Sequence, residues 1–157
     1  MRLIICAAGK ARGTAEDALV AEYAKRLKPA PAGLGPLDIR EIETKEREPA
    51  RRKDDEGAKL LAQIPDAAPL IALDPKGKAL STEDFAAMLG RIRDEGHANL
   101  AFVIGGADGL AAPLIAKARA KLSFGPMVFP HLLARAMLAE QLYRAASLLS
   151  GHPYHRG

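Results

Sequence analysis

Apolar and polar positions along the chain follow two periods. Residues 3–8, 69–74 and 100–106 are short, nearly continuous apolar runs, which are typical of strands buried on both faces. Residues 37–43 alternate apolar and polar side chains, as a half-buried strand does. The segments between them repeat apolar residues every three or four positions, which is the helical period. This order predicts an α/β fold with a mostly parallel sheet and helices on both faces.

The predicted helices begin after residues that cap helices well. Thr14 precedes a helix over residues 15–28, with Asp17 in its first turn, and Pro29 ends it. Ser81 precedes a second helix over residues 82–96. The other predicted elements are a loop at 29–36, a turn at 75–78, a helix over 107–121, a short strand over 122–129 and a closing helix over 130–150.

Residues 44–64 carry dense charge of both signs ahead of an apolar helical pattern. One interpretation is a solvated helix with internal ion pairs that add little stability. The other is a basic segment that contacts phosphates through Arg47, Arg51, Arg52 and Lys53. The pattern favours the solvated helix without excluding the phosphate contact.

Composition narrows the class of protein. The 157 residues, 48% of them hydrophobic, predict one domain over residues 1–157. No apolar run reaches the roughly 20 residues of a membrane span, so we expect no membrane association and a cytoplasmic location. Cys6 is the only cysteine, which excludes an internal disulfide and a thiolate metal cluster and predicts a small buried side chain. The net charge of +4 favours anionic partners only mildly.

Three predicted strand ends carry glycine or proline where the backbone must turn. They are IALDPKGK (71–78), FVIGGADGL (102–110) and SFGPMVFPH (123–131). Ligands of open α/β sheets bind beyond the carboxyl ends of the strands, and Gly105-Gly106 would let one approach the main chain. The alternative is that these glycines serve only a tight strand-to-helix turn. Neither residues 102–110 nor residues 7–13 have the glycine spacing of a dinucleotide-binding motif, which argues against a dinucleotide enzyme.

The closing helix carries apolar residues on more than one face. They are Leu132, Leu133, Met137, Leu138, Leu142, Leu148 and Leu149. One apolar stripe along this helix would pack into the core of the chain. A second stripe on another face predicts another covered surface, such as one shared with a second copy of the chain. Glu140, Arg135 and Arg144 lie among these residues, and an ion pair within the chain is the simplest way to satisfy such charges.

Three segments together resemble the RlmH (YbeA) family of SPOUT-class methyltransferases. They are LDPKGK (73–78), FVIGGADGL (102–110) and the terminal FPHLLARAMLAEQLYRAASLLSGHPYHRG (129–157). The resemblance covers essentially the whole chain, because the length and the order of strands and helices also fit. It implies methylation of N3 of a pseudouridine in the helix 69 loop of 23S rRNA, with the assembled 70S ribosome or large subunit as the substrate.

The resemblance also implies a C-terminal trefoil knot, a homodimer, S-adenosylmethionine as the methyl donor and no metal. Carried over by motif, the donor contacts are Leu73, the Gly105-Gly106 turn and the loop formed by Gly125, Pro126, Met127, Val128, Phe129 and Pro130. Family members often carry Ser-x-Met-Thr in the first part of this loop. Val128 therefore lacks a hydroxyl and Pro126 lacks an N–H, which leaves the side-chain roles there open.

The chain ends in Tyr154, His155 and Arg156. The resemblance implies that this tail crosses the donor pocket of a neighbouring subunit, where the three side chains would meet the target base and its phosphates. His155 is then a candidate base for the N3 proton, and Arg144 or Arg156 is the alternative, as a cation that stabilises the deprotonated base. Pro153 predicts an extended tail. A solvated, frayed terminus and a ribosome-associated protein without catalysis are the competing interpretations.

Overall fold

Five parallel strands form one sheet in the order β2-β1-β4-β3-β5. The computed structural model describes residues 1–156, with side chains as far as Tyr154. The strands are β1 (Arg2–Ala8), β2 (Leu37–Ile42), β3 (Leu70–Ala79), β4 (Asn99–Ile104) and β5 (Ala120–Ser123). The four strands expected at 3–8, 37–43, 69–74 and 100–106 are thereby confirmed.

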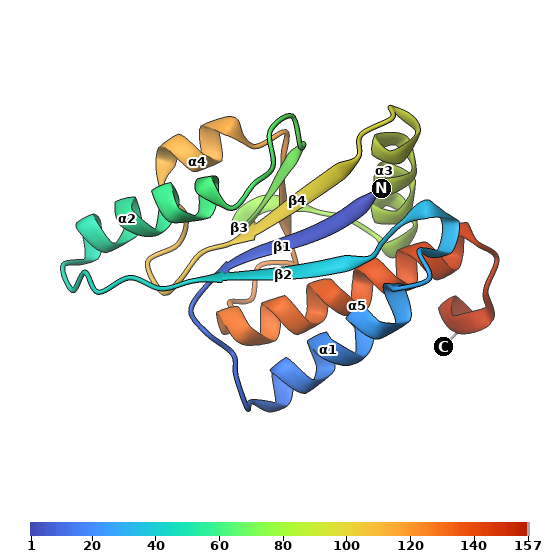
Figure 1. Ribbon diagram of the computed structural model, residues 1–157, viewed down its shortest axis with the longest axis horizontal. Coiled ribbons are helices and arrows are strands. Elements are labelled where there is room, and N and C mark those ends of the chain that lie inside the picture. The colour runs from blue at the N-terminus through green and yellow to red at the C-terminus, as the bar shows by residue number, and fades with distance from the viewer. Residues whose placement is uncertain (157) are drawn as a thin grey trace.

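Helices cover both faces of this sheet (Figure 1). On one face lie α1 (Ala15–Leu27), α3 (Thr82–Asp94) and α5 (His131–Leu149), and on the other lie α2 (Pro49–Ala62) and α4 (Ala112–Lys117). Two 3₁₀ turns, Pro31–Gly33 and Pro153–Arg156, are added at the loops. None of the described helices combines the length and apolar character that crossing a bilayer requires. The α/β prediction is confirmed, and the trefoil knot stays a prediction.

Two hydrophobic cores explain the continuous apolar runs. In β1, Leu3 and Ile5 pack with α1, α3 and α5, whereas Ile4 and Cys6 pack with α2 and α4. Successive side chains of a strand point to opposite faces, so a strand covered on both sides needs an apolar residue at every position. Cys6 is fully buried, as expected, and this burial raises the pKa of its thiol to about 11.

The helix starts follow the predicted caps. The hydroxyl of Thr14 accepts a hydrogen bond from the Asp17 amide at 3.1 Å, and that of Ser81 accepts one from Asp84 at 3.1 Å. α2 begins at Pro49, later than the charge pattern indicated, because the Glu48 carboxylate caps it. The solvated helix, which the pattern of residues 44–64 favoured, is therefore observed. Within it, Lys59 pairs with Asp55 one turn earlier at 2.7 Å.

Two boundaries in the second half of the chain differ from the prediction. The helix expected over 107–121 is confined to Ala112–Lys117, and the strand expected over 122–129 is Ala120–Ser123. Ala118 already has an extended backbone, and the Arg119 amide donates to the Leu70 carbonyl at 2.8 Å. Pairing with the free edge of β3 therefore overrides the helical propensity of this alanine- and lysine-rich segment.

The turn expected at residues 75–78 is a bulge within β3. Leu73 lies opposite Leu122, and after the register shift Lys78 lies opposite the same residue. Gly77 makes this possible, because a Cβ there would lie 2.7 Å from the main chain of Lys121. The bulge residues Asp74 to Lys76 lie between the two pairings with Leu122, ahead of the pairing of Ala79 with Ser123.

A buried arginine attaches α5 to the ends of β1 and β2. Arg135 is 1% exposed, and its Nη1 donates to the Glu41 carboxylate at 2.5 Å. Its Nη2 donates to the carbonyls of Ala8 and Gly9 at 3.3 and 3.0 Å. The same Glu41 oxygen accepts from the Ala11 amide at 2.9 Å. The expected ion pair of Arg135 within the chain is confirmed, while its buried Nε has no hydrogen-bond partner among the described residues.

We predict that Arg135→Leu lowers the free energy of unfolding by about 3–5 kcal/mol, because it leaves a largely buried carboxylate and two strand-end carbonyls without their donor. Urea unfolding followed by circular dichroism measures this change. Arg119→Leu is the matched control, since its partner Glu95 is half exposed, and it should cost less than about 1 kcal/mol. Equal effects of the two substitutions would show that burial does not set the strength of the Arg135 pair.

Candidate functional site at the strand ends

A cleft of about 610 Å³ opens at the carboxyl ends of β3, β4 and β5. These ends point to the left in Figure 1, the side on which α2 and α5 begin. The lining is mainly apolar side chains and exposed main chain, from the bulge of β3, the turn after β4 and the loop before α5. Eight of the nine residues expected to bind the donor lie in this lining: Leu73, Gly105, Gly106, Gly125, Met127, Val128, Phe129 and Pro130. Pro126 belongs to the same loop but does not line the cleft.

The turn after β4 requires glycine for reasons of space. A Cβ on Gly105 would lie 2.7 Å from the carbonyl carbon of Gly109, and one on Gly106 would lie 2.9 Å from a carboxylate oxygen of Glu56. The Gly109 amide donates to the Gly106 carbonyl at 3.1 Å, and Gly109 has a φ of +77°. The glycines thus serve the tight turn that was one of the two interpretations. They also present main chain to the cleft, so the two interpretations are compatible.

Ser123 fixes the loop that forms the third wall. Its hydroxyl donates to the carbonyls of Pro75 and Gly125 at 3.3 and 3.0 Å and accepts from the Gly125 amide at 3.1 Å. Because each hydroxyl has one proton, only one of the two donations is made at a time. Met127 and Val128 are 72% and 84% exposed, so the segment that departs from the usual family sequence presents bare apolar side chains at the mouth of the cleft.

The first two turns of α2 support the cleft from behind. Arg52 donates to the Asp108 carboxylate at 2.6 Å and so holds the turn after β4. Lys53 lines the cleft, and Glu56, one turn further on, is buried against Gly106. The sequence reasoning missed Lys53 and Glu56 as components of this site. The only signal was the dense charge of this helix, which is the usual pattern of a solvated face.

The tail packs on its own chain, away from the cleft. The Tyr154 ring lies 4.7 Å from the Tyr143 ring, and the Arg144 guanidinium lies 4.9 Å from the Tyr154 centroid. The Tyr154 hydroxyl donates to the Glu140 carboxylate at 3.3 Å and lies 3.3 Å from the Tyr23 hydroxyl. Arg144 pairs with Glu140 at 2.7 Å, which confirms the expected ion pair. The extended conformation expected from Pro153 is wrong, because residues Pro153–Arg156 form a 3₁₀ turn.

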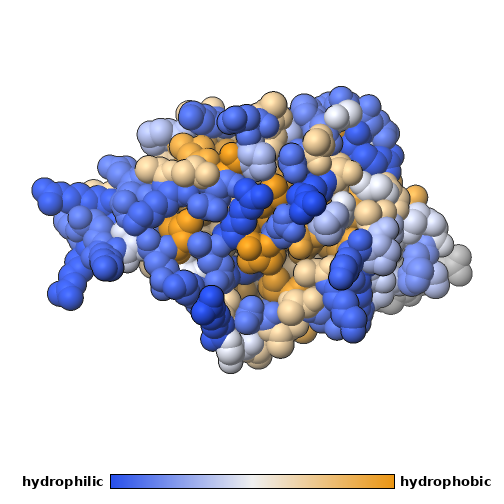
Figure 2. Space-filling model, viewed as in Figure 1, coloured by the Kyte–Doolittle hydropathy of each residue, from blue (hydrophilic) through white to orange (hydrophobic). Residues whose placement is uncertain are grey.

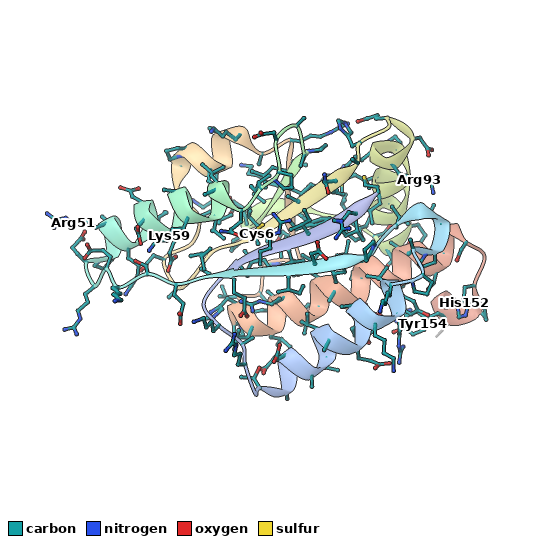
Figure 3. All side chains as sticks on the ribbon, viewed as in Figure 1. Cys6, Arg51, Lys59, Arg93, His152 and Tyr154 are labelled. Carbon is teal, nitrogen blue, oxygen red and sulfur yellow. The ribbon has the colours of Figure 1, made fainter. Side chains whose placement is uncertain are left out.

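The predicted site residues therefore separate into two groups within one chain. The residues expected to bind the donor lie where α5 begins, and Arg144 and Tyr154 lie toward its other end. The 19 residues of α5 place its ends about 28 Å apart. Figure 3 shows Tyr154 and His152 at the end of the molecule opposite Arg51, which projects beside the carboxyl ends of the strands. The side chains of His155 and Arg156 lie outside the described residues.

An apolar groove of about 440 Å³ lies beside Glu140, between α1, α3 and α5. Leu19, which is 48% exposed, and the half-buried Leu133 and Met137 line it. These two α5 residues belong to the second apolar stripe that the sequence pattern showed. The stripe is thus turned toward an open groove and is not enclosed in the core of one chain.

Comparison with known proteins decides the family. A family model described as predicted SPOUT methyltransferase matches residues 1–155. The ribosomal RNA large subunit methyltransferase H of Xanthobacter autotrophicus is 51% identical over 99% of both chains, and that of Rhodopseudomonas palustris is 47% identical over 99% of both. This chain belongs to the RlmH family of SPOUT methyltransferases.

The resemblance noticed in the sequence is thereby confirmed for the whole chain. Among solved structures, the SpoU methyltransferase AviRb from Streptomyces viridochromogenes aligns with a TM-score of 0.45 and 15% identity. The alignment covers 96% of this chain and 61% of that one. A likeness this distant adds nothing to the RlmH assignment, which rests on the full-length relatives.

Docking of the tail predicts an alkaline titration. Burial raises the pKa of Tyr154, and the hydrogen bond to Tyr23 and the nearby negative charge of Glu140 raise it further. The contribution of this phenol to stability is therefore complete below about pH 10, the ordinary tyrosine pKa, and is lost as the pH rises through the raised pKa. In an absorbance titration of phenolate, Tyr154→Phe should remove the part of the rise that lies above the ordinary range. In urea-unfolded wild type, the rise above the ordinary tyrosine range should be absent. If it persists there, the docked tail is contradicted.

Proposed function

We propose that this protein transfers a methyl group from S-adenosylmethionine to N3 of a pseudouridine in the helix 69 loop of 23S rRNA, in the assembled 70S ribosome or large subunit. The observation that carries the proposal is the convergence of eight separately expected residues on one cleft, in a chain whose full-length relatives are named large subunit ribosomal RNA methyltransferases. The relatives' names support the RNA and the reaction class. The base and the atom come from the family resemblance.

The cleft fits an adenosyl-sulfonium donor in size and chemistry. Its volume of about 610 Å³ lies within the ~300–1,000 Å³ of small-molecule sites. Ile104, Leu110 and Leu122 give it apolar walls, and the turn after β4 adds main chain that no Cβ shields. When bound, the donor supplies a methyl group on a cationic sulfur that is already a good leaving group.

Positioning is the main catalytic task of the residues around the cleft. Three loops from different strands form its walls, and the Ser123 hydrogen bonds and the Arg52–Asp108 pair fix two of these loops. Walls that are fixed before binding hold a ligand in one orientation. Holding two reactants in line is worth roughly 7–11 kcal/mol in favourable cases.

The N3 proton of the acceptor must leave as the methyl group arrives. We assign its removal to the tail, with His155 as the candidate base and Arg156 or Arg144 as the cation that stabilises the deprotonated base. Tyr154 would contact the same base. Arg144 and Tyr154 do not reach the cleft of their own chain, because α5 separates them from it. The assignment therefore requires the tail of a second copy.

A homodimer is accordingly part of the proposal. The apolar groove beside Glu140 and the exposed Leu19 offer a surface for a second copy. Burying such apolar side chains is the usual driving force of association. Closing the groove would also bring the second copy next to Arg144 and Tyr154, whose hydrogen bonds to Glu140 lie at its rim.

Exposed cations around the cleft fit an RNA substrate. Arg12, Lys45 and Arg47 follow β1 and β2, and Arg51 lies in the first turn of α2. The carboxylates between them are already engaged, Glu43 by Lys10 and Glu48 by the amides that start α2. Figure 2 shows this end of the molecule as a hydrophilic projection. Exposed cations beside engaged carboxylates can bind phosphates, so the second interpretation of residues 44–64 remains part of the proposal.

We predict that purified protein with radiolabelled methyl donor labels 23S rRNA in ribosomes from cells that lack this gene, at a single pseudouridine. The modest net charge predicts weak binding of naked RNA, so the assembled particle should be a far better substrate than an isolated helix 69 hairpin. Nuclease mapping with mass spectrometry locates the label. Equal labelling of hairpin and ribosome, or label on another base, would contradict this prediction.

Replacing Arg47 and Arg51 together by alanine should raise the KM for ribosomes and leave the affinity for the methyl donor unchanged. The logarithmic salt dependence of ribosome binding should become shallower by about 0.7–0.9 for each phosphate that the protein no longer neutralises. Arg91→Ala with Lys117→Ala is the matched control, because both residues lie in the last turns of helices at the amino ends of the strands. An identical salt slope in both variants would remove this surface from the RNA interface.

A further inference from the structure

Glu56 is a buried carboxylate with one oxygen that finds no partner among the residues the structure describes. The residue is 8% exposed, and among the described residues its Oε2 has no hydrogen-bond partner. Burying an ionised group without a partner is costly. A helix as polar as α2 offers many solvated positions for a glutamate, so this placement needs an explanation that the fold alone does not supply.

The carboxylate lies directly behind one wall of the cleft. A Cβ on Gly106 would lie 2.9 and 3.0 Å from its two oxygens, and Gly106 lines the cleft on the other side. Only the main chain of a glycine therefore separates this carboxylate from the cleft. Any other residue at 106 would displace the carboxylate or thicken the wall.

No salt bridge with Glu56 is formed within the part of the chain that the structure describes. Arg52 is occupied by Asp108, with 2.6 Å between Nη2 and Oδ2. Lys53 reaches the cleft lining, and across the cleft Asp74 accepts from the Lys76 amide at 2.9 Å. Asp74 and Lys53 are both partly exposed, so water screens them. Glu56 is the buried carboxylate of this group, and only the thin wall at Gly106 lies between it and whatever fills the cleft.

We propose that Glu56 determines the charge preference of the donor cleft: it favours a ligand with a cationic sulfur over the same ligand with a neutral thioether. This inference rests on the proposed function. It makes Glu56 a specificity-determining residue that acts through the Gly106 main chain and touches no reacting atom. The methyl donor is cationic and the demethylated product is neutral, so the preference disfavours the product and promotes its release after each turnover.

The test compares the dissociation constants of S-adenosylmethionine and S-adenosylhomocysteine by calorimetry, in wild type, Glu56→Gln and Asp54→Asn. Gln keeps the shape of Glu56 and removes its charge. Asp54 lies on the same helix but is exposed, so the control removes one charge into water. Glu56→Gln should shift the ratio of the two constants toward the neutral ligand by about fivefold to tenfold, and Asp54→Asn should leave it within about twofold.

Glu56→Asp separates charge from packing. It keeps the carboxylate and loses one methylene, so it should hold the wild-type ratio even if both ligands bind more weakly. Thermal unfolding checks that each variant is folded. If Glu56→Gln does not fold, Glu56→Asp decides. A shift in the ratio of the two dissociation constants in this variant, which keeps the carboxylate, overturns the inference. Equal weakening of both ligands by Glu56→Gln also overturns it, whereas failure of wild type to bind either ligand would instead refute the proposed function.

Discussion

The interaction on which the rest of the structure depends is the buried pair of Arg135 and Glu41. Parallel strands leave unpaired carbonyls where they end, and at β1 these would lie in the interior under α5. The Arg135 guanidinium satisfies the carbonyls of Ala8 and Gly9, and Glu41 neutralises its charge. One side chain thus joins two strand ends to the start of α5. The loop between β5 and α5 is consequently held at both ends, and this loop forms one wall of the cleft.

The same helix that builds the cleft carries the tail away from it. α5 begins with His131, whose ring lies close to Gly9. A Cβ on Gly9 would lie 3.1 Å from Nε2 of His131. The helix ends at Leu149, beyond which Tyr154 is packed against Tyr143 and Arg144. A stiff helix fixes the separation between these two groups. Chemistry that needs both groups therefore needs two chains, and this constraint follows from the backbone alone.

The sequence predicted what depends on local pattern. The two-faced apolar runs identified β1 and β4, and Thr14 and Ser81 marked helix starts to the residue. Motif resemblance placed eight residues in the cleft. The sequence did not predict the early end of α4, because the edge of β3 that captures Arg119 is distant in sequence. Glu56 was missed because burial of one glutamate in a charged helix depends on Gly106, fifty residues away. The docked turn of the tail depends likewise on Tyr23 and Glu140.

The sealed position of Cys6 has a practical use. The chain has no other cysteine, and a thiol with a pKa of about 11 in the middle of the sheet is both inaccessible and protonated at neutral pH. A cysteine introduced on the surface would consequently be the single reactive sulfur of the native protein. Fluorophores or spin labels attached there could report the distance between the tail of one molecule and the cleft of another, without any need to remove the natural thiol.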